Sequence, residues 1–224
     1  MAIRIWGRPT SSCTQKSLWA MEEVGVDYEL ILASAVMGPG GHVSKGNKPF
    51  GIVDTPEYRA MNPNGTVPTI DDNGYVLWES NSIVRYLSMK YAPEKMYGND
   101  IGTFCDASRW MDWEAHTQLP WAYIIVMQTV RLAPDQRDPK ELARATAALE
   151  SKFRMLDAHL AGRKYVCGDG FTLGDIPIGM RTYRWLLFDI EHPKTPHIDA
   201  WMARLKERPG FQKHLADPAL HLSG

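Results

Sequence analysis

The opening of the chain shows first a strand-like and then a helix-like spacing of apolar residues. Residues 3–6 alternate apolar and polar side chains, as a half-buried strand does. Apolar positions then recur at helical spacing up to Gly25, and either Ser11 or Ser12 can cap this helix. Residues 28–32 follow as a second strand. A strand, a helix and a strand in this order predict a parallel pair with a right-handed crossover.

The same kinds of pattern return after a long connection. Residues 33–55 are rich in glycine and lysine, and a connection of this length often carries function. Beyond it we expect a short helix over 56–61, a strand from Val67-Pro68 onward, a strand over 75–78 paired with it through Asp72-Asn73-Gly74, and a helix over 79–91. The complete order is β-α-β-α-β-β-α, so residues 1–91 are predicted to form an α/β thioredoxin-like domain.

The rest of the chain shows helical spacing without evident strands. Residues 92–100 break the periodicity, and we interpret them as a linker to an all-α helical domain over 101–224. Within this domain we expect a long helix over about 103–131 with a kink at Pro120, and helices that begin at capping boxes over 138–141 and 172–175. Pro177 is a difficulty for the last helix, because a proline one turn in removes a backbone hydrogen bond.

Composition and net charge indicate which kinds of binding partner the protein is not expected to have. The 224 residues are 44% hydrophobic and carry a net charge of −1, so no basic surplus favours nucleic acid or an anionic membrane. No apolar run reaches the roughly 18 residues of a membrane span, and the N-terminus leads directly into a strand, so we expect a cytoplasmic protein. The three cysteines are far apart and lack metal-ligand spacing, which predicts neither disulfides nor a metal site.

The most informative motif lies between residues 62 and 80. A valine followed by a proline at the start of a strand, Val67-Pro68, suggests a cis peptide bond that leaves the valine N–H and C=O free for an extended peptide-like ligand. Glu79 offers a carboxylate to an ammonium group. Ser80 and the unpaired amides of the following helix start suit a carboxylate. Together they fit an amino-acid head on an extended backbone, which is the shape of glutathione.

These residues, with the N-terminal run over 9–16, resemble the soluble glutathione S-transferases of bacterial type, with theta-like and beta-like features. The resemblance spans nearly the whole chain. In the family, a valine at this place pairs with the cysteinyl backbone of glutathione, and a Glu-Ser pair holds its γ-glutamyl end. The resemblance therefore implies that Val67, Pro68, Glu79 and Ser80 bind glutathione.

The reaction that the resemblance implies requires the thiol of glutathione in its ionised form, the thiolate. Three residues at the first strand-to-helix turn could stabilise this thiolate. A free thiol has a pKa of about 8.5, so only a few per cent is ionised at neutral pH. By resemblance, Ser11 falls where theta-class members carry an activating hydroxyl, and Cys13 falls where the beta class carries a cysteine that can form a mixed disulfide with glutathione. We take Ser11 as the first candidate for the catalytic residue, Cys13 as the second and Ser12 as the third.

Further site residues follow from the same resemblance. His42 is similar to a theta-class histidine that contacts the glycyl carboxylate of glutathione. Trp113, His116 and Trp121 lie on the long helix and are expected to contact a flat, hydrophobic electrophile, with His116 similar to a beta-class active-site histidine.

The predicted function is conjugation of glutathione, as co-substrate, to hydrophobic electrophiles. One alternative is a glutathione-dependent thiol-disulfide oxidoreductase or peroxidase that works through bound glutathione or Cys13. A second alternative is a non-enzymatic binder of apolar ligands. The resemblance implies a homodimer with a detoxification role, and we expect no metal, no nucleic acid and no membrane partner.

Overall fold

Four strands form one mixed sheet. The computed structural model of the protein describes residues 2–34 and 51–222. The strand order is β2-β1-β3-β4, and the strands are β1 (Ile3–Gly7), β2 (Tyr28–Leu32), β3 (Thr69–Asp72) and β4 (Tyr75–Trp78). β1 and β2 are parallel, as predicted, whereas β3 is antiparallel to β1 and β4. Asn73 (φ 54°) and Gly74 (φ 93°) make the predicted hairpin turn, which needs positive φ at both central positions.

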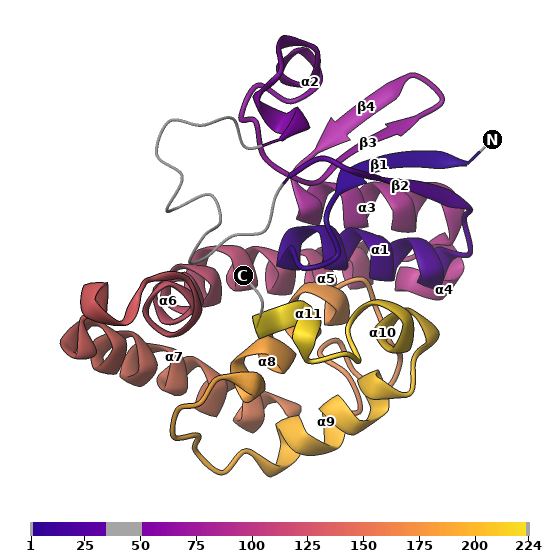
Figure 1. Cartoon of the computed structure of the whole chain (residues 1–224). Coiled ribbons are helices and arrows are strands. Elements are labelled where there is room, and N and C mark those ends of the chain that lie inside the picture. Colours follow the sequence, from indigo (N-terminus) through magenta and orange to yellow (C-terminus); the bar gives the residue numbers. More distant parts are fainter. Residues whose placement is uncertain (1, 35–50, 223–224) are drawn as a thin grey trace.

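Helices cover both sides of the sheet. α1 (Ser12–Val24) and α3 (Ser80–Tyr91) lie side by side on one face (Figure 1). η2 (Ile52–Asp54) and α2 (Pro56–Met61) lie toward the other side, where Val53 and Tyr58 pack with Trp6 of β1. The order of strands and α-helices is therefore the predicted β-α-β-α-β-β-α, and the thioredoxin-like fold is confirmed.

Residues 92–100, which we interpret from the sequence as a linker, contain a short helix that the sequence pattern did not predict. Pro93–Tyr97 form a helix, α4, which ends at Gly98 in the left-handed conformation (φ 63°). Met96 is fully buried, and its carbonyl oxygen accepts a hydrogen bond from the backbone N–H of Leu173 at 3.1 Å. The sequence pattern did not show this helix because a helix of five residues is too short to show a periodic pattern.

The long helix expected over about 103–131 is interrupted near Pro120, as predicted. The interruption is a change from α-helix to π-helix just before the proline. The segments are α5 (Ile101–Trp113), the π-helical η3 (Glu114–Gln118), α6 (Leu119–Val126) and the π-helical η4 (Met127–Arg131). Pro120 lies in the first turn of α6, directly after η3. A π-helical turn widens the backbone at this point, which accommodates the proline.

The helical part is built around α8. The remaining elements are η5 (Pro134–Gln136), α7 (Pro139–Leu160), α8 (Asp175–Leu187), α9 (Pro196–Lys206), α10 (Pro209–His214) and α11 (Ala219–Leu222). Every residue of α8 from Asp175 to Trp185 is buried. α8 contacts α1, α5, α6, α9 and α11, and Figure 1 shows the helical part lying below the sheet. The all-α second domain is thus confirmed.

One half of the predicted capping box at 172–175 forms directly before α8, whereas the backbone N–H of Asp175 donates to the carbonyl oxygen of Thr172 at 3.0 Å and not to its hydroxyl. The Asp175 carboxylate accepts hydrogen bonds from the backbone N–H and the hydroxyl of Thr172, at 2.8 and 3.2 Å. Pro177 is the third residue of α8, where a backbone N–H has no partner within the helix. The difficulty raised by Pro177 therefore disappears, because the proline removes no hydrogen bond. Asp138 caps α7 as predicted, accepting from the backbone N–H of Lys140 at 2.8 Å.

Candidate active site

A cavity of about 400 Å³ lies where the end of β1, the start of α1 and the loop before β3 meet. Ser11 and Val67, which the sequence marks in two separate motifs, both line it. The other lining residues are Arg8, Ser34, Val53, Asp54, Arg59, Asn64, Gly65 and Thr66. The fold thus brings the candidate hydroxyl and the candidate peptide-binding valine to one site.

The loop before β3 presents the backbone of Val67. The Val67-Pro68 peptide bond is cis, as predicted, and β3 begins directly after it at Thr69. Within the described part of the chain, neither the N–H nor the C=O of Val67 has a hydrogen-bond partner. An extended peptide can therefore pair with both groups at the wall of the cavity.

Two buried side chains that sequence reasoning missed hold this loop. The Tyr58 hydroxyl donates to the carbonyl oxygen of Thr66 at 2.7 Å and lies 2.8 Å from the hydroxyl of Thr69. Asn62 Nδ2 donates to the same two oxygens, at 2.9 and 3.1 Å. Asn62 Oδ1 accepts from the backbone N–H of Asn64 at 3.1 Å. An asparagine before a proline is a turn signal in the sequence, but the contact of Tyr58 with the loop is visible only in the fold.

Glu79 and Ser80 lie at the start of α3, outside the cavity that Ser11 and Val67 line. Glu79 is exposed and has a positive φ of 70°, and its carbonyl oxygen accepts from the backbone N–H of Ile83 at 2.9 Å. Ser80 is the first residue of the helix and is buried. The pair therefore offers a free carboxylate next to a helix start, the combination that suits both ends of an amino-acid head.

Among the three candidates at the first turn, Ser11 is the one that lines the cavity. It is the N-cap of α1, and its Oγ accepts a hydrogen bond from the backbone N–H of Thr14 at 3.3 Å. An accepting hydroxyl keeps its own proton, which it can donate to a ligand. Ser12 and Cys13 are the first two residues of α1 and are half-buried.

Three arginines surround this turn, and the sequence did not mark them. Arg8 Nε donates to the hydroxyl of Thr10 at 3.1 Å, and Arg184 of α8 donates through Nη2 to the carbonyl oxygen of Thr10 at 2.5 Å. Arg131, the last residue of η4, lies near both arginines and near Cys13. We name Arg8, Arg131 and Arg184 the arginine cluster.

The arginines of this cluster repel one another. Burial, followed by the charge of Arg131, lowers the pKa of Arg8 to about 10. Burial, together with the charges of Arg181, Arg131 and Arg8, lowers the pKa of Arg184 to about 9. Negative charge at Cys13 acts in the opposite direction on all three members of the cluster. The surroundings of the turn are therefore strongly positive.

Comparisons with known proteins agree with this geometry. The family model described as glutathione S-transferase, N-terminal domain, matches residues 10–89, and the model of the C-terminal domain matches residues 119–209. Glutathione S-transferase GstB of Escherichia coli strain K12 is 34% identical over 96% of this chain and 99% of its own length. Glutathione S-transferase 4 of Zea mays is 30% identical over 95% of this chain and 91% of its own length.

A solved structure points to the same assignment. The theta-class glutathione S-transferase of Xanthomonas axonopodis pv. citri, solved with glutathione bound, superposes with a TM-score of 0.85 at 40% identity and covers 96% of this chain and 98% of its own. The chain belongs to the glutathione S-transferase family. The predicted enzyme class is thereby confirmed at the level of the family, and the theta-class neighbour agrees with the theta-like features in the sequence.

The residues expected to bind the second substrate of this transferase are spread over the helical part. Trp113 packs edge-on against the buried Trp110 at 5.3 Å between ring centroids, Trp121 lies under Arg144 of α7 at 5.0 Å, and His116 is exposed. None of the three predicted residues lines the cavity with Ser11, so their role stays a prediction. His42 lies outside the described residues.

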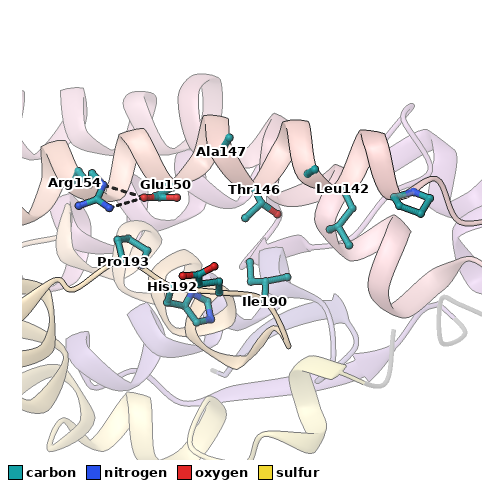
Figure 2. Close-up of a pocket in the computed structure, with 11 residues that line it drawn as sticks. Leu142, Thr146, Ala147, Glu150, Arg154, Ile190, His192 and Pro193 are labelled. Atoms are coloured by element: carbon teal, nitrogen blue, oxygen red, sulfur yellow. Dashed lines mark hydrogen bonds and ion pairs between the residues drawn. The ribbon is translucent and has the colours of Figure 1, made fainter.

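A second hollow, of about 430 Å³, lies away from this site. Figure 2 shows it between α7 and the segment after α8, with Leu142, Thr146 and Ile190 facing it and Glu150 paired with Arg154 at 2.6 Å. None of the predicted site residues lines it.

Two negative findings concern only the described residues. In 2–34 and 51–222, no group of three or more His, Cys, Asp or Glu side chains could hold a metal ion. In the same ranges, no helix is long and apolar enough to cross a membrane.

Proposed function

We propose that this glutathione S-transferase binds glutathione along Val67 and activates its thiol with the hydroxyl of Ser11, so that the thiolate attacks a small electrophile. The observation that carries the proposal is the shared cavity of Ser11 and Val67. A tripeptide whose cysteinyl backbone pairs with the free N–H and C=O of Val67 has its sulfur within the same cavity as the hydroxyl. The protein then supplies alignment and thiolate stabilisation, which are the main demands of this reaction.

The energy required is within reach of one hydroxyl. Lowering a thiol pKa by about two units requires roughly 2.7 kcal/mol of preferential stabilisation of the anion. A hydrogen bond to a charged group contributes about 1.5–3 kcal/mol, and a helix N-terminus adds about 0.3–1 kcal/mol. Ser11 supplies both, because it is a donor that caps the start of α1.

The test compares Ser11→Ala with Ser12→Ala, the same substitution one residue further along. Ser11→Ala is expected to lower kcat/KM for a chlorinated nitroaromatic by about 10²-fold. It should also raise the pKa of enzyme-bound glutathione, followed through the ultraviolet absorbance of the thiolate. Ser12→Ala should retain most of the activity, and circular dichroism checks that both variants are folded. Full activity in a folded Ser11→Ala would contradict the proposal.

A redox function is the second candidate, because Cys13 is a free, half-buried thiol two residues from Ser11. Its test is Cys13→Ala in a glutathione-dependent disulfide reduction assay. Loss of this activity, with conjugation retained, would assign a separate redox role to Cys13. Loss of conjugation in Cys13→Ala but not in Ser11→Ala would make Cys13 the activating residue.

The finer features expected from the resemblance belong to the same proposal. We place Glu79 and Ser80 at the γ-glutamyl end of glutathione, and we expect a homodimer acting in detoxification in the cytoplasm. The exposed apolar side chains of Met89 on α3 and Ile101 on α5, at 53% and 74% exposure, support the dimer because apolar groups gain from being covered.

A further inference from the structure

Two members of the arginine cluster, Arg131 and Arg184, have charges that no anion among the described residues compensates. Arg184 is buried at 4% exposure, yet its side chain donates only to neutral groups: His221 Nδ1 at 3.1 Å and the carbonyl oxygens of Thr10 and Leu220 at 2.5 and 3.4 Å, with Gln15 Oε1 at 3.5 Å. A guanidinium does not deprotonate at neutral pH, so Arg184 is a buried cation without an anion among the described residues.

Arg131 also lacks an anionic partner among the described residues. Among the described residues it makes no ion pair, and its Nε is buried without a hydrogen-bond partner. Its guanidinium carbon lies 5.7 Å from the ring centroid of Tyr123, a half-exposed residue of α6, and the side chain also hydrogen-bonds to this neutral tyrosine. A contact between a guanidinium and an aromatic ring stabilises the charge by less free energy than a buried ion pair with a carboxylate would.

Three other buried or half-buried cations in the described part of the chain, Lys16, Arg181 and Arg208, are compensated. Lys16 and Arg181 both pair with Glu114, at 3.3 and 2.7 Å. Arg208 pairs with Glu23 at 2.5 Å. Leaving a buried charge unpaired is costly, so a protein that pairs these cations internally and leaves Arg131 and Arg184 unpaired has a positive site suited to an external anion.

The position of the cluster indicates which ligand supplies the anion. Arg131 and Arg184 come from the helical part and approach the start of α1 there, whereas Val67 faces Ser11 from the loop before β3. Neither Arg131 nor Arg184 lines the cavity with Val67. Arg184 reaches the carbonyl oxygen of Thr10, next to Ser11, from outside that cavity. We therefore assign the peptide cradle to glutathione and the two unpaired arginines to the second substrate.

On this basis we propose that Arg131 and Arg184 form a binding subsite for a carboxylate on the electrophile, so that this enzyme prefers anionic electrophiles over neutral ones of the same shape. This inference rests on the proposed function. For a chloromethyl substrate, the thiol proton leaves to solvent, the thiolate forms the C–S bond, and the C–Cl bond breaks with its electron pair on chloride. The arginines hold the carboxylate and take no part in the bond changes.

The test compares two ligands that differ only in charge. S-(4-carboxybenzyl)glutathione and S-(4-carbamoylbenzyl)glutathione are titrated into the full chain by calorimetry. Turnover of 4-(chloromethyl)benzoate and 4-(chloromethyl)benzamide is measured in parallel. The wild-type protein should favour the carboxylate member of each pair by about tenfold, as expected for a charge-assisted hydrogen bond.

Variants assign the preference to the cluster. Arg131→Gln should abolish the preference, Arg131→Lys should retain a part of it because the charge remains, and Arg137→Gln should retain all of it. Arg137 is the matched control because it is exposed a few residues further along and donates to the carbonyl oxygen of Leu132 at 3.0 Å.

The remaining outcomes would contradict either the carboxylate subsite or the proposed function. Equal binding of the two conjugates to the wild-type protein would overturn the subsite while leaving the proposed function intact. Equal weakening of both conjugates by Arg131→Gln would also overturn it, because the arginine would then hold glutathione itself. Binding of neither conjugate, together with no turnover, would overturn the proposed function.

Discussion

At the scale of single residues, the binding surface depends on side chains behind it. Tyr58 is 1% exposed, and its hydroxyl joins the carbonyl oxygen of Thr66 to the hydroxyl of Thr69, on either side of Val67 and Pro68. The side-chain amide of Asn62 donates hydrogen bonds to the same two oxygens. The backbone groups that Val67 offers are thus positioned by two polar side chains that do not line the cavity.

Removing one hydroxyl should therefore loosen the glutathione site. Tyr58→Phe is expected to cost about 1–2 kcal/mol at this loop, because the hydrogen bonds of the hydroxyl to Thr66 and Thr69 are both lost. We expect a rise of about fivefold in the KM for glutathione, with a smaller change in kcat. Steady-state kinetics with glutathione varied measures both constants. Tyr75→Phe, at a 51% exposed tyrosine of β4, is the control and should behave as the wild type. An unchanged KM in Tyr58→Phe would show that Asn62 alone holds the loop.

At the scale of elements, the start of α8 is organised by one carboxylate. Asp175 is fully buried and accepts four hydrogen bonds. The donors are the backbone N–H groups of Val166 and Thr172, the hydroxyl of Thr172, and Nε1 of Trp201, which comes from α9. The carboxylate thus connects the preceding loop and α9 to the helix that carries Arg181 and Arg184.

Asp175→Asn should destabilise the protein, because an amide nitrogen would face the N–H of Thr172 and leave that donor unpaired. We expect a loss of about 2 kcal/mol in the free energy of unfolding, measured by urea denaturation. Asp169→Asn is the matched control, since Asp169 is exposed in the same loop. Equal stability of the two variants would mean that the capping hydrogen bonds contribute little.

At the scale of the whole molecule, a buried ionic network joins the two domains. Lys16 of α1 donates to Asn81 of α3 at 3.0 Å and pairs with Glu114 of η3, which also accepts from Arg181 Nε at 2.8 Å. Burial opposes ionisation of Glu114, but the charges of Lys16 and Arg181 outweigh it and hold its pKa below the ordinary value of 4.5. Lys16 lies one helical turn beyond Cys13, so the network connects α1, which carries the candidate catalytic residues, to the helical domain.

Glu114→Gln should be strongly destabilising, because it leaves two buried cations without an anion. We expect a loss of about 3–5 kcal/mol at neutral pH. The pKa of Glu114 is lowered by folding, so its contribution is present above about pH 4.5 and is lost as the pH falls through the pKa in the folded protein. The difference between wild type and variant, from unfolding curves at several pH values, should therefore shrink toward pH 3.

The control is the same substitution on an exposed ion pair. Glu141→Gln removes the partner of Arg144, at 2.8 Å on the surface of α7, and should cost less than about 1 kcal/mol. Equal loss of stability in the two variants would contradict a stabilising role of the buried network. A stability difference between the wild type and Glu114→Gln that did not depend on pH would contradict it as well.

The sequence by itself determined the elements and the motif residues, because these depend on neighbours in the chain. Alternation over 3–6 and the turn at Asn73-Gly74 are set by local backbone geometry, and both were predicted, as was the cis bond at Val67-Pro68. Resemblance in the same motifs was enough to indicate the family. The helix α4 was missed because five residues show no periodicity.

Only the tertiary structure decided what surrounds the first turn of α1. Arg131 and Arg184 reach the first turn of α1 from helices more than a hundred residues away in sequence, and in the sequence they are ordinary helix residues. Whether an arginine is paired or unpaired depends on the charges that folding brings to it. The same holds for Tyr58 and for the choice of Ser11 as the residue in the cavity. Local chemistry sets the elements, whereas burial and charge are properties of the packed molecule.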